Sequence, residues 1–465
     1  MLETLCKTQI SQNILDEKQK QQYIGKFFLK TYGCQMNEYD SQKMAKMVDE
    51  LGLTKCNSIQ DADLIIINTC HIREKATEKL YSELGRIRKT KKPEAKIVVA
   101  GCVAQAEGEE VIRRTEGLVE LIIGPQSIHL LPGLVYKALS NQTFNPINLD
   151  FPGMDKFDVI PESQYNHGIN GHLTIQEGCD KFCKFCCVPY TRGAEYSRPV
   201  EKIYREALIL ASNGVKTVNL LGQNVNAYHG LDENNNNCNL GRLLLEYISK
   251  IPQFVRIFYT TSHPNDMHDE LYEAHRKIKN LIPFVHLPIQ SGSNKILKDM
   301  NRKHTKEEYI EIINKLRENR PDIQFSTDII VGYPGETDED FQDTYDLVES
   351  VKYAQSYIFK YSPRIGTPAA SRTDQVEKQV VDERFQRLKI LVDKQQMEIN
   401  KTFVEKKLEV LFEKINENNQ LVGRSQYMQL VFANVTEDYD ANMIGKIANV
   451  KITRAFGHSL LGDVV

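Results

Sequence analysis

The feature that most constrains this chain is a group of three cysteines on one short segment. Cys179, Cys183 and Cys186 have the spacing C-x3-C-x2-C and come shortly after the apolar run at residues 173–175. A structural zinc site uses four protein ligands, and no fourth cysteine at a matching spacing completes this set. A cubic iron–sulfur cluster held by three cysteines keeps one iron open for a further ligand. The spacing therefore favours such a cluster over an incomplete zinc site or three buried free cysteines.

Three further cysteines each follow a segment that is typical of a buried strand. They are Cys34, Cys70 and Cys102, and the segments before them span residues 27–29, 64–67 and 97–100. Strands that alternate with helices indicate a parallel sheet, and ligands bind at the edge where the carboxyl ends of its strands meet. We therefore expect the three thiols to converge on one edge of a sheet. The alternative is three unrelated core residues, because free cysteine is often buried.

A helix is expected between the first two of these strands. Asp40 is a plausible N-cap, and the apolar residues that follow at helical spacing form one face. These apolar residues are Met44, Met47, Val48 and Leu51. The same α/β unit continues with a strand-like run at residues 121–125 and a helix that ends near Leu139.

A second series of strands and helices begins at Leu173, after a loop rich in Asn, Pro, Asp and Gly. Further strands are expected at residues 218–221, 257–259, 284–287, 325–331 and 356–360, with helices between them, for example at 200–212 and 341–351. Six such units fit a partial, open (β/α)6 barrel. The active site of a barrel lies at the carboxyl ends of its strands, which is where the cysteines at 179–186 are expected.

The last part of the chain has a different sequence pattern. A long helix at about 376–401 precedes short strand-like runs at 408–412, 421–423, 428–433 and 446–453. This pattern predicts a small antiparallel β-barrel. Small β-barrels often bind nucleic acid, and the alternative, a barrel that merely packs on the rest of the protein, is equally consistent with the pattern alone.

Composition limits the class of protein and the compartment to which these cysteine triads can belong. The chain has 465 residues, of which 41% are hydrophobic and 26% charged, as in a soluble protein of about three domains. No apolar run approaches the roughly 20 residues of a membrane helix, and the first 25 residues lack a secretory signal. Ten cysteines in such a chain indicate metal ligation in a reducing compartment, so we predict a cytoplasmic protein without membrane contact. The net charge of −3 gives no overall signal for nucleic acid.

Several short motifs identify a family. They are GCQMN at 33–37, NTC at 68–70, IREKA at 72–76, GCVAQ at 101–105, VPYTRG at 188–193, GQNVN at 222–226, TSHP at 261–264, HLPIQSGS at 286–293 and VGYPGET at 331–337. On these motifs the chain resembles the radical S-adenosylmethionine (SAM) methylthiotransferases. It is most similar to the branch that adds a methylthio group to C2 of N6-isopentenyladenosine in tRNA. The likeness runs from about Phe27 to the C-terminus, and His71 and Cys187 are its small departures from the usual residues.

The resemblance implies two [4Fe–4S] clusters. An auxiliary cluster would be held by Cys34, Cys70 and Cys102. The cluster that binds and cleaves SAM would be held by Cys179, Cys183 and Cys186. The implied division of the chain is a polar extension (1–25), an N-terminal methylthiotransferase domain of parallel α/β type (26–142), a linker (143–164), a radical-SAM domain (165–398) and a TRAM domain that binds RNA (399–465).

The implied chemistry explains why two centres are needed. The C–H bond at C2 of adenine is too weakly acidic for any side-chain base at neutral pH, so a cofactor must break it. In the implied reaction, cleavage of SAM yields a 5′-deoxyadenosyl radical that takes this hydrogen. The auxiliary cluster carries the sulfur, which a second SAM methylates. The implied partners are tRNA carrying N6-isopentenyladenosine and a low-potential electron donor.

Candidate SAM contacts follow the strands of the predicted barrel. They are Gly222, Gln223, Asn224, Ser262, Gln290 and Gly332. Ordinary loop capping is the alternative for each of them, whereas glycine at 332 would permit a close backbone approach to the adenosine. His286 is interpreted as a packed strand residue rather than a ligand.

Other functions remain open at this point. The acceptor could instead be threonylcarbamoyladenosine in tRNA or an aspartate of a ribosomal protein. A different class is a non-catalytic iron–sulfur protein that binds RNA or acts as a sensor. Two complete triads argue against that class, because a sensor needs only one cluster and no SAM-binding loops. The sequence leaves the electron donor, the source of the sulfur, the oligomeric state and the tolerance for modified isopentenyl groups undefined.

Overall fold

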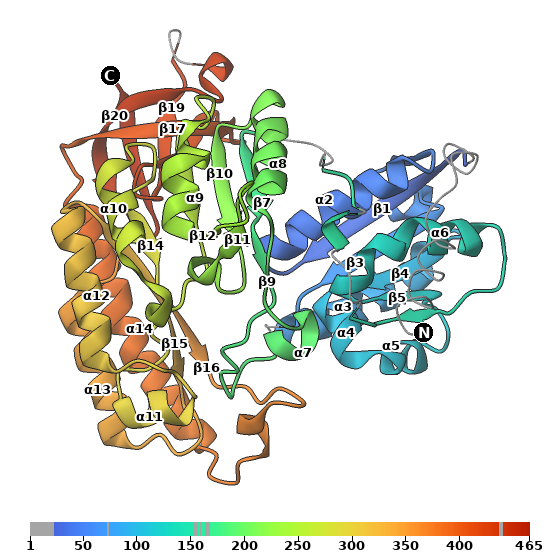
Figure 1. Cartoon of the computed structure of the whole chain (residues 1–465), viewed down its shortest axis with the longest axis horizontal. Helices are drawn as coiled ribbons and strands as arrows, with labels where there is room; N and C mark the ends of the chain where they lie inside the picture. The colour runs from blue at the N-terminus through green and yellow to red at the C-terminus, as the bar shows by residue number, and fades with distance from the viewer. Residues whose placement is uncertain (1–22, 72–73, 152–155, 159, 163–167, 437–439) are drawn as a thin grey trace. The chain divides into compact units, whose positions relative to one another are not determined.

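The computed structural model describes residues 23–71, 74–151, 156–158, 160–162, 168–436 and 440–465. These residues form two compact units (Figure 1). The first unit contains the chain up to residue 162 together with Glu177–Asp180 and Cys186–Tyr196. The second contains Gly168–Gln176, Lys181–Phe185 and Ser197–Val465. No helix in the described part of the chain is long and apolar enough to cross a membrane.

The first unit is built on a six-stranded parallel sheet with the order β2-β1-β3-β4-β5-β6. The strands are β1 (Gly25–Tyr32), β2 (Leu53–Lys55), β3 (Leu64–Thr69), β4 (Lys96–Ala100), β5 (Leu121–Ile123) and β6 (Ile147–Asn148). Every residue of β3 is buried, as expected for a central strand that is covered on both faces. The predicted parallel sheet is confirmed. The two-residue β6 was missed, and it lies in the segment that we expected to be a linker.

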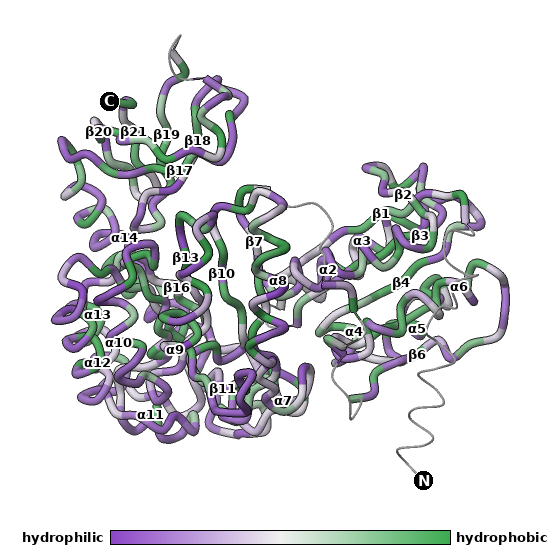
Figure 2. The backbone as a smooth tube through the Cα atoms, turned by 45° about the horizontal axis from the view of Figure 1, so that its top comes forward, coloured by the Kyte–Doolittle hydropathy of each residue, from purple (hydrophilic) through white to green (hydrophobic). Residues whose placement is uncertain are grey.

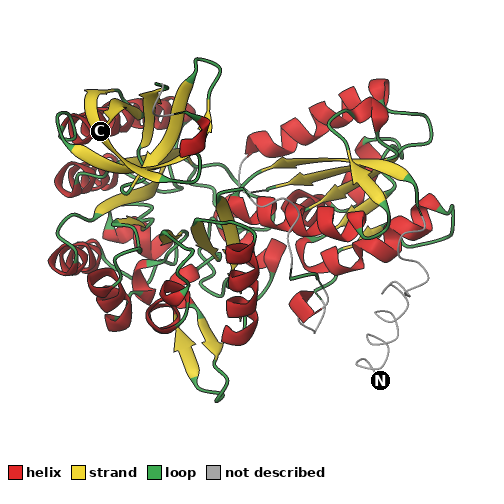
Figure 3. Cartoon of the chain, turned by 90° about the horizontal axis from the view of Figure 1, so that it is seen from above, coloured by secondary structure: helices red, strands yellow, loops and turns green. Residues whose placement is uncertain are grey.

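Helices cover both faces of this sheet (Figure 3). They are α2 (Gln35–Asp49), α3 (Glu74–Thr90), α4 (Cys102–Glu107), α5 (Glu109–Arg114) and α6 (Leu131–Leu139). The apolar face of α3, with Leu80 and Leu84, packs against Ile65 and Val99 of the sheet. The motif residues Ile72 and Arg73 lie outside the described part of the chain.

The prediction of Asp40 as an N-cap is wrong. Helix α2 begins directly after the turn that follows β1, and Cys34 occupies the N-cap position with an extended backbone. Asp40 therefore lies in the second turn of the helix, where its side chain is almost fully buried. Its carboxylate accepts a hydrogen bond from Arg192 at 2.7 Å, a partner 152 residues away that the local sequence does not reveal.

The second unit begins with six parallel strands in two three-stranded sheets, β13-β10-β7 and β14-β15-β16. The strands are β7 (Asn170–Thr174), β10 (Thr217–Leu221), β13 (Arg256–Tyr259), β14 (Phe284–His286), β15 (Gln324–Val331) and β16 (Gln355–Lys360). Strand β13 leads on to β14 across one isolated parallel bridge between Ile257 and Leu281. The predicted partial (β/α)6 barrel is confirmed.

Helices surround these strands and form the outer layer. They are α8 (Val200–Ser212), α9 (Leu240–Glu246), α10 (Asp269–Lys277), α11 (Asn294–Asp299), α12 (Lys306–Asn319), α13 (Asp338–Val351) and α14 (Lys378–Lys401), with a small hairpin of β11 (His229–Leu231) and β12 (Asn237–Asn239). Figure 2 shows β10 as largely hydrophobic and α12 and α13 as mainly hydrophilic. Val218, Val285 and Ile329 point outward into the core beneath the helices. Because side chains alternate along a strand, their neighbours point to the inner face.

The chain ends in a closed five-stranded barrel with the order β17-β18-β19-β21-β20. The strands are β17 (Lys407–Ile415), β18 (Gln420–Ser425), β19 (Leu430–Asn434), β20 (Ile447–Ala455) and β21 (Ser459–Val464). The predicted small barrel is confirmed, although β21 was missed. The pairing of β19 with β21 is parallel, whereas the other four pairings of this barrel are antiparallel.

One arginine joins the two barrels of the second unit. Arg256, at the start of β13, donates hydrogen bonds to the carbonyl oxygens of Arg424 at 2.6 Å and Glu409 at 2.7 Å. It also donates to the carbonyl oxygen of Ser425 at 3.2 Å. Burial lowers the pKa of Arg256 to about 10, so the guanidinium stays charged at neutral pH. The small C-terminal barrel is thus held, through its backbone, at the amino end of β13 in the (β/α)6 barrel.

Candidate functional site

Three cysteines meet at the carboxyl edge of the N-terminal sheet. Cys34, Cys70 and Cys102 follow β1, β3 and β4, which are adjacent parallel strands. Cys70 and Cys102 are buried, and Cys34 is partly exposed. A Cβ atom on Gly33 would lie 2.5 Å from Cβ of Cys70, so the turns after β1 and β3 are in contact. The structure brings the three thiols to one edge, and their role as cluster ligands stays a prediction.

Two buried asparagines hold these turns together. Asn37 Nδ2 donates to Asn68 Oδ1 at 3.0 Å, and Asn68 Nδ2 donates back to the Asn37 carbonyl oxygen at 2.8 Å. The Cys34 thiol donates to Asn37 Oδ1 at 3.2 Å. Gly101 has a φ of +93°, and a Cβ atom there would lie 2.3 Å from Asn68 Oδ1. The residue before Cys102 must therefore be glycine for the three turns to approach.

The thiols of this edge sit in an uneven electrostatic environment. The pKa of Cys34 is lowered to about 6, chiefly by its hydrogen bond with the Cys70 thiol and further by the positive charge of Arg192. Burial raises the pKa of Cys102, and the charge and hydrogen bond of Arg192 oppose that rise. A cluster requires thiolates, and a nearby cation favours them.

The second triad lies on the loop after β7. Arg302 Nη1 lies 3.8 Å from the sulfur of Cys183 and can donate to it. Asn301 Nδ2 donates to the carbonyl oxygens of Lys181 at 3.1 Å and Phe182 at 3.0 Å. Residues 301–302 therefore hold the middle of the loop within the second unit.

The ends of this loop belong to the first unit. Cys186 accepts a hydrogen bond from the backbone N–H of Val188 at 3.5 Å, and Cys179 is partly exposed. Phe182 on this loop is 53% exposed. Phe185 packs against the buried cluster that contains Met300 and Tyr333.

The donor set of each triad fits an iron–sulfur cluster. In the described ranges no three His, Cys, Asp or Glu side chains are close enough to hold one metal ion. Each triad consists of thiols alone, which are the ligands of iron–sulfur clusters, and a four-iron cube spans a larger space than one ion.

Two of the predicted SAM contacts carry buried atoms that have no hydrogen-bond partner among the residues that the structure describes. Asn224 follows β10; its side-chain nitrogen donates to Asp266 at 2.9 Å, while its Oδ1 has no hydrogen-bond partner among the described residues. Ser262 follows β13, and its buried Oγ likewise has none there. Unpaired buried polar atoms are rare, so both are open to a ligand at this edge.

The other predicted contacts follow strands of the barrel, and their role in binding SAM stays a prediction. Gly222 faces Gln176, whose Oε1 would be 2.6 Å from a Cβ atom. Gln290 has a φ of +73° and forms an isolated parallel β-bridge with Ile329 of β15. Gly332 has a φ of +75°, and a Cβ atom there would lie 2.4 Å from the side chain of Val381 on α14. The packing of α14 by itself therefore requires glycine at 332.

The sequence analysis missed an aromatic row on the inner face of the barrel. Tyr357 and Phe359 of β16 are 49% and 39% exposed, and Tyr357 pairs in register with Asp328 of β15. His286 of β14 lies beside them, with its ring centroid 6.1 Å from that of Tyr357 and its Nε2 3.7 Å from Asp328. Aromatic residues at alternate positions of a strand were the signal that could have found this row. His286 belongs to the row and lines the inner face.

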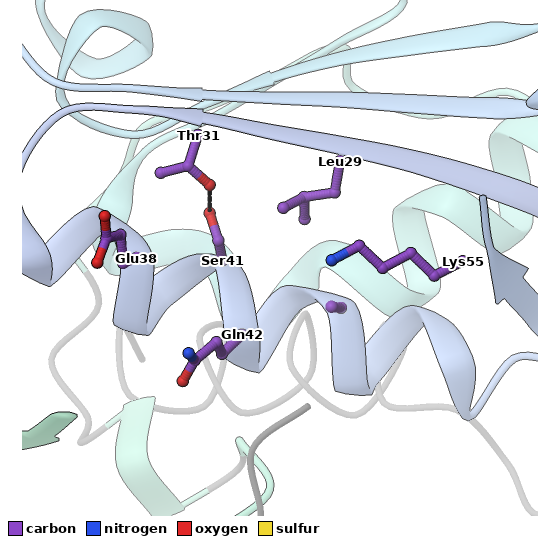
Figure 4. A pocket seen from close by; sticks show the side chains of 7 residues that line it. Leu29, Thr31, Glu38, Ser41, Gln42 and Lys55 are labelled. Carbon is purple, nitrogen blue, oxygen red and sulfur yellow. Dashed lines mark hydrogen bonds between the residues drawn. The ribbon is translucent and has the colours of Figure 1, made fainter. Parts of the chain in front are cut away.

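A separate pocket lies between β1 and α2 (Figure 4). It is lined by Leu29, Thr31, Glu38, Ser41, Gln42, Ala45 and Lys55. Thr31 donates to Ser41 at 2.7 Å, and Ser41 accepts from Asn68 at 2.9 Å, so the pocket wall is connected to the asparagine pair. The pocket contains none of the cysteines.

The chain matches three known families in sequence. Residues 26–124 match an uncharacterized protein family, UPF0004, residues 173–348 match the radical SAM superfamily, and residues 401–465 match the TRAM domain. Two solved structures share the fold. They are the radical SAM methyltransferase TsrM from Kitasatospora setae, with a TM-score of 0.53, 12% identity and coverage of 75% of this chain and 77% of that one, and the cobalamin-dependent SAM radical enzyme OxsB, with a TM-score of 0.51, 13% identity and coverage of 80% and 56%.

Curated relatives match almost the whole chain. The tRNA-2-methylthio-N(6)-dimethylallyladenosine synthase of Wolbachia pipientis subsp. Culex pipiens (strain wPip) is 56% identical over 94% of this chain and 98% of its own length. The proteins of the same name from Ehrlichia ruminantium (strain Gardel) and Rickettsia canadensis (strain McKiel) are 54% and 52% identical, over 94% of this chain and 98% and 99% of their own lengths. The chain therefore belongs to the tRNA-2-methylthio-N(6)-dimethylallyladenosine synthase family of radical-SAM methylthiotransferases.

Proposed function

We propose that this chain adds a methylthio group to C2 of N6-isopentenyladenosine next to the anticodon of tRNA. The observation that carries the proposal is the presence of two complete cysteine triads. One lies at the carboxyl edge of the N-terminal sheet, and the other follows the first barrel strand. A reaction that both cleaves SAM and inserts sulfur needs two such centres, and the relatives with 52–56% identity bear the name of this activity.

The two triads have different roles in this proposal. Cys34, Cys70 and Cys102 hold the auxiliary cluster, and Cys179, Cys183 and Cys186 hold the cluster that binds SAM. When bound, the two [4Fe–4S] clusters and SAM supply the one-electron chemistry and the sulfur. The protein supplies geometry: Asn37 and Asn68 hold the turns of the first triad, and Arg302 lies against Cys183 of the second.

SAM binds at the carboxyl edge of the barrel in this proposal. The side-chain oxygen atoms of Asn224 and Ser262, which have no partner in the described part of the chain, support this site, because each can gain a hydrogen bond from a polar ligand. The remaining proposed contacts follow neighbouring strands. They are Gly222, Gln223, Gln290 and Gly332.

The target base is held by the inner face of the barrel. The exposed rings of Tyr357 and Phe359 offer a surface on which adenine can stack, and stacking on aromatic side chains is a common way to hold an unpaired base. The TRAM domain at residues 401–465 binds the tRNA outside the barrel. A low-potential electron donor and a cytoplasmic location complete the proposal, since the substrate is tRNA.

Nucleoside mass spectrometry of tRNA tests the function directly. Cells that lack the gene should accumulate N6-isopentenyladenosine without the methylthio group, and the wild-type gene should restore the product. In vitro, the reconstituted enzyme should convert isopentenylated tRNA and leave unprenylated tRNA untouched. Methylthiolation of a ribosomal protein, with unchanged tRNA, would move the chain to another branch of the family.

A further inference from the structure

A chain of buried ion pairs runs through the first unit. Arg192 Nη2 lies 2.7 Å from Asp40, and its Nη1 lies 2.9 Å from Glu177. Lys156 Nζ lies 2.6 Å from the other oxygen of Glu177. Each of these four side chains is only 2% exposed. This series of ion pairs contains two cations and two carboxylates, so its formal charges balance.

Arg192 is the member of this chain that reaches the first triad. It is the last residue of α7 (Val188–Arg192), a helix that begins two residues after Cys186. Helix α7 lies next to α4, whose first residue is Cys102, and the charge of Arg192 acts on the thiols of both Cys102 and Cys34. One side chain therefore connects the segment that follows the second triad with the thiols of the first.

Stability alone is a poor explanation for this arrangement. Taking four charged groups out of water has a large desolvation cost, and apolar side chains of similar volume often stabilise a protein as well or better. A buried cation next to thiolates has a different consequence, because it acts through a low dielectric on any charge that the thiolates hold. The potential of an iron–sulfur cluster depends on its net charge and on hydrogen bonds to its sulfur ligands.

We propose that Arg192 is a positioning residue that raises the reduction potential of the auxiliary cluster, and that Asp40 moderates this effect. The proposal rests on the proposed function, in which Cys34, Cys70 and Cys102 hold that cluster. One-electron reduction adds a negative charge to the cluster, which a guanidinium beside its ligands stabilises. The negative charge of the Asp40 carboxylate partly offsets the positive charge of this guanidinium and disfavours the reduced form.

The test is a redox titration of the auxiliary cluster in the full-length chain. Replacing Cys179, Cys183 and Cys186 together by Ala leaves one cluster, whose midpoint potential is followed by electron paramagnetic resonance. In this background Arg192→Gln should lower the equilibrium constant for reduction at least tenfold, which is about 59 mV for one electron. Arg192→Lys keeps the charge and should retain most of the potential. Asp40→Asn should shift the potential upward.

The opposite signs of the two expected shifts in potential distinguish an effect of charge from an effect of loosened packing. If Arg192→Gln and Asp40→Asn shift the potential in the same direction, broken packing explains both, and the proposal is wrong. Arg113→Gln is the matched control, because this arginine pairs with Glu110 on the exposed surface of the same unit. A shift with Arg192→Gln no larger than with Arg113→Gln would also overturn the proposal. A triple variant without any cluster would instead overturn the ligand assignment on which it depends.

Discussion

Tyr357 and Asp328 lie side by side on the inner face of the barrel, because they are paired in the register of β16 and β15. Tyr357 is nonetheless 49% exposed, so a large part of this residue is open to a ligand. Stacking of a base on an aromatic side chain contributes about 1–3 kcal/mol, as measured by substitution with alanine. Tyr357→Ala should therefore raise the KM for isopentenylated tRNA by about fivefold to 150-fold.

The variant Tyr357→Phe serves as its control, because it keeps the ring and loses only the hydroxyl. It should stay close to the wild type in steady-state kinetics with tRNA. The cleavage of SAM without tRNA should be unchanged in both variants. Equal KM values for Tyr357→Ala and the wild type would exclude stacking on this residue.

Iron content tests the ligand sets. Anaerobically reconstituted protein should carry about eight irons, since each triad is proposed to hold a four-iron cluster. Cys183→Ala and Cys70→Ala should each reduce this number to about four. Cys238→Ala is the control, because this cysteine is buried in the barrel core and belongs to neither triad. Stoichiometric zinc with little iron would contradict the assignment of both sites.

Product analysis separates the two triads. Cys186→Ala should abolish formation of 5′-deoxyadenosine, because it removes a proposed ligand of the cluster that cleaves SAM. Cys102→Ala should still cleave SAM under reducing conditions and should form no methylthio product. The reason is that Cys102 lies at the edge of the N-terminal sheet, whereas the barrel has its own hydrophobic core. Chromatography of both products after one reaction distinguishes the variants, and normal methylthiolation by Cys102→Ala would refute the auxiliary role.

The sequence was most informative where chemistry and local structure coincide. Continuous apolar runs at residues 64–67 and 97–100 predicted two central parallel strands, and both exist. Because Cys70 and Cys102 come directly after these strands, their convergence on one edge follows from the topology of a parallel sheet. The position of these two cysteines in the sequence was therefore enough to place each of them in the turn that follows its strand.

Contacts between distant segments could not be predicted in this way. The partner of Asp40 is Arg192, and nothing near Asp40 in the sequence indicates that a helix would begin at Gln35 and bury it. Strand β21 was also missed; it forms a hairpin with β20 and closes the barrel through its parallel pairing with β19, a strand that does not adjoin it in the sequence. The packing of Gly332 against Val381 also depends on where α14 returns to the barrel.

The junction between the two barrels of the second unit should depend on Arg256. Replacing it by Ala leaves the carbonyl oxygens of Arg424, Ser425 and Glu409 without this donor. An unsatisfied buried polar group costs about 1–3 kcal/mol, so the small barrel should detach more readily. Limited proteolysis near residues 401–406 should accelerate, and the KM for tRNA should rise. Arg276→Gln, at a 60% exposed position, should change neither, and unchanged proteolysis of Arg256→Ala would contradict this role.

His275 should make the second unit sensitive to acid. Its ring is fully buried, its Nε2 lies 2.7 Å from the Tyr259 hydroxyl, and burial lowers its pKa from the ordinary 6.5 to about 3. Above pH 6.5 the residue is neutral in both the folded and the unfolded chain, so it adds no pH dependence. Below pH 6.5 only the unfolded chain binds the proton, and stability falls until the pH reaches about 3. At pH 4.5, two pH units below the ordinary pKa, this loss is about 3 kcal/mol.

His275→Gln removes the titrating group and should therefore flatten the decline in unfolding free energy between pH 6.5 and 4.5 by about that amount. The absolute stability at pH 7 is expected to fall, because the hydrogen bond with Tyr259 is lost, so the slope and not the intercept is the relevant quantity. Urea unfolding followed by circular dichroism at several pH values measures it. His229→Gln, at an exposed position on β11, should leave the slope as in the wild type. Parallel pH profiles for the wild type and His275→Gln would mean that His275 does not stay neutral in the folded protein.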